Sequence, residues 1–150
     1  LKTDPTSRRI IINLWNSATQ HRAALPSCLC QYQFWVDTES NALSLQIYIR
    51  SSDYFLANNW NTCTGALFVH LLCNTPGLTH LHPGELVVTT GDTHIYLTHL
   101  EQVKINLERR PYPFPKLVVG TTKPITEFEW EDIRLVGYRS HPKIEAEMAI

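Results

Sequence analysis

The residues best suited to chemistry lie in two short stretches. In the first, the turn-forming Pro26-Ser27 leads to a thiol at Cys28, directly before an alternating aromatic segment. The thiolate is the nucleophilic form of cysteine, and a neighbouring guanidinium favours it over the thiol. The second stretch, Arg50-Ser51-Ser52-Asp53, supplies a guanidinium, two hydroxyls and a carboxylate at the end of a predicted strand. Such a density of anion-binding and hydrogen-bonding groups indicates a binding site.

A cysteine alone is more often a small buried residue than a nucleophile, because free Cys is among the most buried residue types. The residues around Cys28 leave both interpretations open. No second Cys/His pair at zinc-finger spacing accompanies Cys28-x-Cys30, so we expect no metal site. The remaining cysteines, Cys63 and Cys73, fall in an apolar helical segment, and we expect both to be packing residues.

Period-two alternation predicts the strands that position these groups. Residues 43–50 place Leu43, Leu45, Ile47 and Ile49 on one face. The strand that follows the turn alternates between one face with Cys28, Cys30, Tyr32 and Phe34 and another with Leu29, Gln31, Gln33 and Trp35. Further strands are expected at 8–15, 85–89, 116–119 and 133–138, with turns at 37–41 and 90–92.

Two helices are predicted. Residues 61–73 carry apolar residues on most sides, which indicates a buried helix in which Asn61 is a candidate N-cap. Residues 99–109 are amphipathic and end at a proline-rich connector, 111–115. We expect loops at 16–24 and 76–84 and an irregular tail at 141–150. Strands with one buried helix and a second helix predict an α+β fold with a mixed sheet, formed by one domain over residues 1–150.

Composition excludes several classes of protein. The chain is 43% hydrophobic and 18% charged, which is typical of a globular domain. A net charge of −1 provides no basic field for DNA. No apolar run approaches the roughly 18 residues of a membrane helix, and no signal peptide is recognisable. Four cysteines without a secretory signal are interpreted as free thiols, so we expect a cytoplasmic protein without a membrane partner.

Motifs along the whole chain resemble the C-terminal half of the thymidylate synthase family, in family order and spacing. They are Arg8-Arg9-Ile10-Ile11, Leu25-Pro26-Ser27-Cys28, Gln33-Phe34, Arg50-Ser51-Ser52-Asp53, Phe55-Leu56, Asn61, Gly91-Asp92-Thr93-His94-Ile95-Tyr96, Pro113-Phe114-Pro115-Lys116-Leu117, His141-Pro142 and Met148-Ala149-Ile150. The resemblance implies a mixed, twisted sheet layered with helices. It also implies a homodimer in which two subunits pack sheet against sheet.

The resemblance further implies reductive methylation of dUMP to dTMP, with 5,10-methylene-tetrahydrofolate as co-substrate. Cys28 matches the nucleophile that adds to C6 of the uracil ring, and Arg50 matches the arginine that contacts both thiol and phosphate. Asn61 matches the amide that bonds N3 and O4 and so selects uracil over cytosine. Asp53 matches the residue that contacts the base and the folate pterin. The implied catalytic residues are therefore Cys28, Arg50, Asp53 and Asn61.

Other positions match substrate contacts of the family. Arg8 and Arg9 match a pair that reaches the phosphate of the partner subunit. His94 and Tyr96 match a pair on the 3′-hydroxyl of the sugar. The remaining implied nucleotide-site residues are Gln33, which supports the thiol strand, and Ser51 and Ser52, with Ser51 on the phosphate. The implied folate contacts are Asp53, Leu56, Ala57 and Ile150, the last as a C-terminal residue that closes over the ligands.

The chain also departs from the family pattern. Leu29 replaces the histidine that commonly follows the nucleophile, and residues 57–65 differ around the place where folate meets C5 of the ring. The N-terminal half of the family is absent from this sequence, which implies a part of a longer enzyme. Two alternatives stay open: a pyrimidine-nucleotide hydroxymethylase, in which water replaces hydride at the methylene carbon, and a non-catalytic dimeric nucleotide-binding module.

Overall fold

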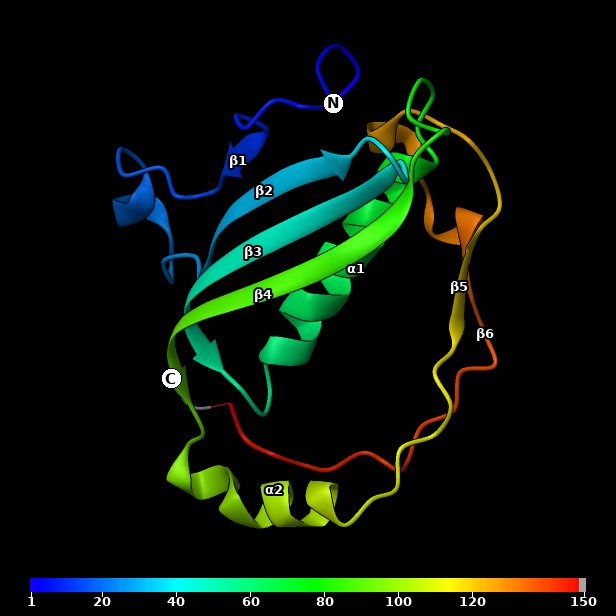
Figure 1. Cartoon of the computed structure of the whole chain (residues 1–150). Coiled ribbons are helices and arrows are strands. Elements are labelled where there is room, and N and C mark those ends of the chain that lie inside the picture. Colours follow the sequence, from blue (N-terminus) through cyan, green and yellow to red (C-terminus); the bar gives the residue numbers. More distant parts are fainter. Residues whose placement is uncertain (149–150) are drawn as a thin grey trace.

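The structure is a computed structural model that describes residues 1–148. Its main sheet has the strand order β1-β2-β3-β4 (Figure 1). The strands are β1 (Ile11–Asn13), β2 (Leu29–Asp37), β3 (Ala42–Asp53) and β4 (His82–His94). The first three strands are antiparallel, whereas β4 runs parallel to β3. The predicted α+β class with a mixed sheet is confirmed.

The helix α1 (Asn58–Cys73) provides the crossover between the parallel strands β3 and β4, and it packs behind them (Figure 1). The predicted alternation in β3 is confirmed, because Leu43, Leu45, Ile47 and Ile49 are each 0% exposed. Phe68 of α1 makes edge contacts with Tyr32 and Phe34, with ring centroids 5.5 Å apart in both pairs. These contacts fix the distance between the helix and the sheet.

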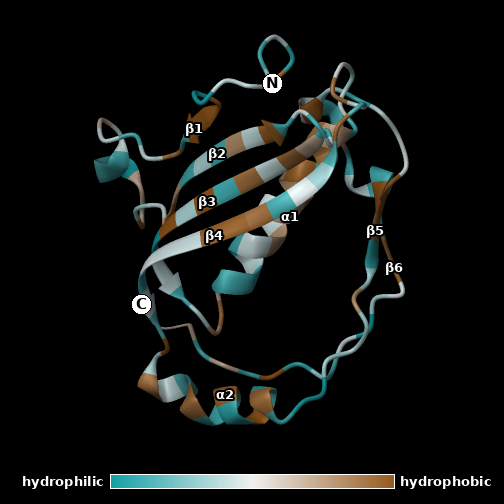
Figure 2. Cartoon of the chain, in the orientation of Figure 1, coloured by the Kyte–Doolittle hydropathy of each residue, from teal (hydrophilic) through white to brown (hydrophobic). Residues whose placement is uncertain are grey.

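The opposite face of the sheet is open in the described chain. Trp35, Tyr48 and Val87 lie on it and are 38%, 41% and 39% exposed, and Figure 2 shows apolar segments alternating with polar ones along these strands. The chain exposes 10781 Å², whereas a compact monomer of 17.2 kDa exposes about 7,800 Å². Much of the surface is therefore left uncovered by the described residues themselves.

Beyond β4 the chain forms a looser layer. It contains α2 (Leu100–Leu107) and a separate antiparallel pair, β5 (Lys116–Val119) with β6 (Ile133–Val136). Single 3-10 turns cover Gln20–Arg22, Leu97–His99, Ile125–Glu127 and Trp130–Asp132. The tail up to residue 148 has no helix or strand and runs back along α2 (Figure 1). No helix within residues 1–148 is long and apolar enough to cross a membrane.

Two predicted boundaries are wrong. No turn interrupts β4 at 90–92, and the strand continues to His94. Position 91 of the strand requires glycine, because a Cβ there would lie 2.7 Å from the carbonyl oxygen of Arg50 on β3, closer than side chains approach. The helix α1 begins at Asn58 with Ala57 as N-cap residue, so Asn61 lies inside the helix and is not its cap.

Two predicted environments are also wrong. Cys63 is exposed on α1, whereas Cys73 is buried as expected and its burial raises the pKa of the thiol to about 11. Leu29 does not share the open face with Gln31. It pairs with the core residue Ile49 and packs against the core, because a register shift between Leu29 and Gln31 reverses the phase of the strand.

Candidate active site

Arg50 connects β3 to the loop that presents Cys28. Its Nη2 donates a hydrogen bond of 2.8 Å to the carbonyl oxygen of Pro26, and its Nε donates one of 3.0 Å to that of Ser27. The backbone N–H of Arg50 donates to the carbonyl oxygen of Cys28 at 2.8 Å. Charge-assisted hydrogen bonds of this kind are stronger than neutral ones. The guanidinium predicted to contact the thiol therefore holds the turn that carries it.

Trp15 contacts the Arg50 side chain, a contact that the sequence did not indicate. The guanidinium carbon of Arg50 lies 5.2 Å from the centroid of the Trp15 ring, within cation–π range. Leu14, the residue before it, donates its backbone N–H to the carbonyl oxygen of Cys30 at 2.8 Å, so the segment after β1 is attached to β2. The only signal for Trp15 in the sequence was its place in a β-branched run, which carries no information on this partner.

Asp53 organises the turn between β3 and α1. Its Oδ1 accepts the backbone N–H groups of Phe55 and Leu56, each at 3.1 Å. Asp53 also faces His94 across the parallel pair of strands, and the N–H of Tyr54 donates to the carbonyl oxygen of His94 at 2.9 Å. The structure thus brings Asp53 and His94 together and holds Leu56 beside them.

His94 and Tyr96 lie side by side. Their rings meet edge to face with centroids 5.0 Å apart. Nδ1 of His94 lies 2.8 Å from a carboxylate oxygen of Asp92, which can only accept a hydrogen bond, so Nδ1 carries the hydrogen. In the neutral ring, Nε2 is then an acceptor. The pair can therefore receive a hydroxyl group.

Asn61 and Ala57 are linked within the first turns of α1. The amide nitrogen of Asn61 lies 3.4 Å from the carbonyl oxygen of Ala57, a long hydrogen bond. Both residues are partly buried at the same end of the sheet as Asp53. The hydroxyl of Ser52, which is 1% exposed, has no partner among residues 1–148, whereas Ser51 is partly accessible.

Three predicted residues lie apart from this group. Gln33 sits on β2 opposite Gln46, on the open face of the sheet. Arg8 and Arg9 are exposed before β1, and neither guanidinium makes a hydrogen bond or ion pair within residues 1–148. Within one chain the structure does not bring these two arginines to Cys28. The predicted contact of Ile150 lies outside the described residues.

Three hollows lie near the described chain's tail, its N-terminal segment and α2, and the one beside α2 is also lined by Phe55 and Leu56. One lies between the turn before α2 and the tail, a second beside the N-terminal segment, and a third between α2 and residues 140–144. Cys28 lines none of the three; it is partly buried and packs against the core. No three His, Cys, Asp or Glu side chains within residues 1–148 are placed to hold a metal ion.

Comparison with known proteins decides the family. The family model described as thymidylate synthase matches residues 1–150, the whole chain. The chain belongs to the thymidylate synthase family. It is 42% identical over 150 residues to a curated thymidylate synthase of Mycoplasma pneumoniae (strain ATCC 29342 / M129 / Subtype 1), covering 100% of this chain and 50% of that protein. The chain thus spans about half the length of the curated relative it matches.

Within the thymidylate synthase family, this half contains the thiol loop, the Arg50–Asp53 strand end and the His94–Tyr96 pair on one continuous sheet. The surface in excess of a compact monomer is consistent with a chain that covers half of its relative. His99, which the residue patterns did not single out, contacts Tyr96 and Phe55.

Proposed function

We propose that the protein containing this chain is a thymidylate synthase that converts dUMP to dTMP, with 5,10-methylene-tetrahydrofolate as co-substrate. The observation that carries the proposal is the pair of hydrogen bonds from Arg50 to the carbonyl groups that precede Cys28. These bonds hold the loop that carries the thiol in place, as addition of a cysteine sulfur to an electron-poor ring requires. Membership of the family supports the choice of substrate.

In the proposed reaction, the thiolate sulfur of Cys28 forms a bond to C6 of the uracil ring, and the displaced electron pair makes C5 nucleophilic. The bound folate supplies the one-carbon unit and the hydride. Asp53 orients the turn at Phe55 and Leu56, where we place the contact with the pterin. Ser51 and Ser52 are placed on the nucleotide, because they lie between Arg50 and Asp53 on one strand.

The His94–Tyr96 pair is proposed to bind the 3′-hydroxyl of the sugar. Asp92 fixes the hydrogen of His94 on Nδ1, and the free acceptor on Nε2 suits a hydroxyl donor. Asn61 is proposed to select uracil, since an amide can donate to O4 and accept from N3–H at the same time. Cytosine presents the reversed pattern at these two positions and leaves buried polar groups unpaired.

We also propose a homodimer that packs the open sheet faces together. Support comes from the exposed Trp35 and Tyr48 on that face and from a surface about 3,000 Å² larger than a compact monomer of this mass has. Gln33 lies on the same face. Arg8 and Arg9, unpaired within residues 1–148, are proposed to reach the phosphate in the partner subunit. Four free thiols favour a cytoplasmic location.

The decisive experiment is the mass of the nucleotide formed from dUMP and 5,10-methylene-tetrahydrofolate by the natural protein that contains this chain. A gain of one CH₂ group identifies dTMP and supports the proposal. A gain of one CH₂O group identifies a hydroxymethylase and overturns the methylation step. Tight binding of dUMP without any product identifies a nucleotide-binding module.

A further inference from the structure

His99 is a buried histidine to which the proposed chemistry gives no role. It ends the 3-10 turn Leu97–His99 and is 1% exposed. Its backbone N–H donates to the carbonyl oxygen of Tyr96 at 2.9 Å, so both residues belong to one turn. The backbone of His99 is therefore tied to that of Tyr96.

The His99 ring packs between two residues of the proposed site. Its centroid lies 5.7 Å from that of Tyr96, edge to face, and 5.7 Å from that of Phe55. Tyr96 belongs to the pair assigned to the sugar, and the backbone of Phe55 is held by Asp53. His99 thus contacts both the sugar side and the folate side of the site.

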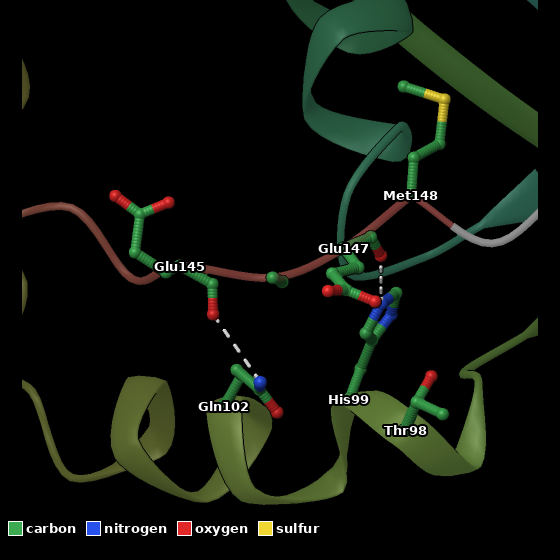
Figure 3. Close-up of a pocket in the computed structure, with 7 residues that line it drawn as sticks. Thr98, His99, Gln102, Glu145, Glu147 and Met148 are labelled. Carbon is green, nitrogen blue, oxygen red and sulfur yellow. Dashed lines mark hydrogen bonds between the residues drawn. The ribbon is translucent and has the colours of Figure 1, made fainter.

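The third contact of His99 is the tail. Nε2 of the ring lies 2.7 Å from the carbonyl oxygen of Glu147, a distance typical of a strong hydrogen bond (Figure 3). A carbonyl can only accept, so Nε2 carries the hydrogen. Nδ1 of His99 has no partner among residues 1–148. The ring therefore makes a single hydrogen bond within these residues, and its partner is the tail.

The tail depends on such contacts because residues 141–148 form no helix or strand. Gln102 donates to the carbonyl oxygen of Glu145 at 3.4 Å, as Figure 3 also shows, and Arg109 donates to that of Pro142 at 2.8 Å. The His99 bond is the shortest of these three and the nearest to the end of the described chain. It comes from a residue 48 positions away in the sequence.

We propose that His99 is a positioning residue that couples nucleotide binding at the His94–Tyr96 pair to the placement of the tail. The anchoring of the tail stands on the geometry alone, whereas the coupling rests on the proposed function. Nucleotide that fixes Tyr96 also fixes the His99 ring, and the ring fixes the carbonyl group of Glu147. An allosteric coupling of this kind changes an equilibrium by about 5–150-fold.

The test uses the natural protein and endoproteinase Glu-C, which cleaves after glutamate. To attack the bond after Glu147, the protease must reach the carbonyl group that His99 holds, so the cleavage rate reports release of the tail. Cleavage after Glu39, in the exposed turn between β2 and β3, is the internal reference. Intact-protein mass follows both cleavages, and calorimetry measures dUMP binding separately.

In the wild type, saturating dUMP is expected to slow cleavage after Glu147 at least 5-fold. His99→Phe keeps an aromatic ring but lacks the donor, and we expect at least 5-fold faster cleavage without nucleotide and no protection by bound dUMP. His99→Gln restores an N–H donor near the position of Nε2 and should restore both rates to within about 2-fold. His80→Phe, a change at an exposed loop histidine, should alter neither rate.

Unchanged cleavage after Glu147 in His99→Phe overturns the anchor, whether or not dUMP binds. Protection by dUMP that persists in His99→Phe overturns the coupling. Faster cleavage after both Glu147 and Glu39 would show general unfolding and would also overturn the assignment. If the wild type does not bind dUMP, the proposed function fails, and the anchor is still decided by the rates without nucleotide.

Discussion

The carbonyl oxygen of Pro26 accepts a hydrogen bond of 2.8 Å from Nη2 of Arg50, a residue 24 positions later in the chain. The same guanidinium binds the next carbonyl group, that of Ser27. This fork closes the turn before Cys28 against β3. The loop that carries the thiol is therefore held by both the side chain and the backbone of Arg50 on the neighbouring strand.

Arg50→Lys should destabilise the natural protein by about 1–3 kcal/mol, because a lysine ammonium cannot bind the two carbonyl groups in the geometry of the guanidinium fork. Urea unfolding measures the difference. Arg22→Lys, on an exposed turn, is the matched control and should change stability by less than about 0.5 kcal/mol. Equal effects of the two substitutions would show that the fork does not stabilise the loop.

Cys28→Ala should abolish turnover and leave dUMP binding measurable, because the nucleophile forms the covalent bond but does not hold the phosphate. Fluoro-dUMP with 5,10-methylene-tetrahydrofolate should give a covalent adduct that peptide mass spectrometry maps to Cys28. Cys63→Ala, at an exposed cysteine, should retain activity. An adduct on Cys30 or Cys63 would contradict the assignment of the nucleophile.

An Arg9→Ala chain mixed with a Cys28→Ala chain should regain part of the activity that each has lost. In the heterodimer, one of the two sites keeps both Cys28 and the arginine from the other subunit. Activity of purified, differently tagged heterodimers measures this complementation, and the two parent homodimers are the controls. Inactive heterodimers would indicate that each site is completed within one chain.

Asn61→Asp should weaken dUMP binding and improve dCMP binding, since a protonated carboxyl group can satisfy the reversed pattern of cytosine. Sites that read a polar pattern discriminate by up to about 10⁴-fold. Because α1 begins at Asn58, a change in helix capping does not confound the result. Calorimetric titration of both nucleotides against both proteins provides the ratio, and an unchanged ratio would remove Asn61 from the uracil pocket.

Cys73 should make stability depend on pH in the alkaline range. The unfolded thiol ionises at about 8.5, whereas burial keeps the folded thiol neutral up to a pKa of about 11. Between these values the folded state retains a proton that the unfolded state has lost. The free energy of unfolding is therefore unaffected by this thiol below about pH 8 and falls by about 3 kcal/mol as pH rises through the window. Urea unfolding at pH 8 and pH 10 should show a smaller loss in Cys73→Ala.

The sequence predicted those parts of the fold that depend on local pattern. Alternation along 43–50 identified the core residues of β3 because every second side chain enters the same layer. Gly91 misled the prediction of β4, since a glycine required by a close approach of two strands has the same local pattern as one in a turn. The exposure of Cys63 depends on which other segments pack against α1, and the local sequence pattern carries no information on those segments.

The candidate site likewise contains residues that the sequence identified and contacts that it did not. The resemblance named Arg50 and His94 because their motifs are contiguous in the sequence. It did not indicate that Arg50 binds the carbonyl groups of the thiol loop or that Trp15 lies against the guanidinium. His99 could only be read as the start of a helix, because its partner in the tail lies 48 positions later. Contacts between distant segments require the assembled structure.

The edge position of β4 has a consequence for handling this polypeptide by itself. Its outer side pairs with no other described strand, so the backbone groups of a 13-residue strand are presented in a row. Natural sheets protect such rows with charges or prolines, yet the stretch from Leu86 to Thr90 contains neither. A separately expressed chain therefore offers a template for strand addition, and aggregation during refolding would begin along β4.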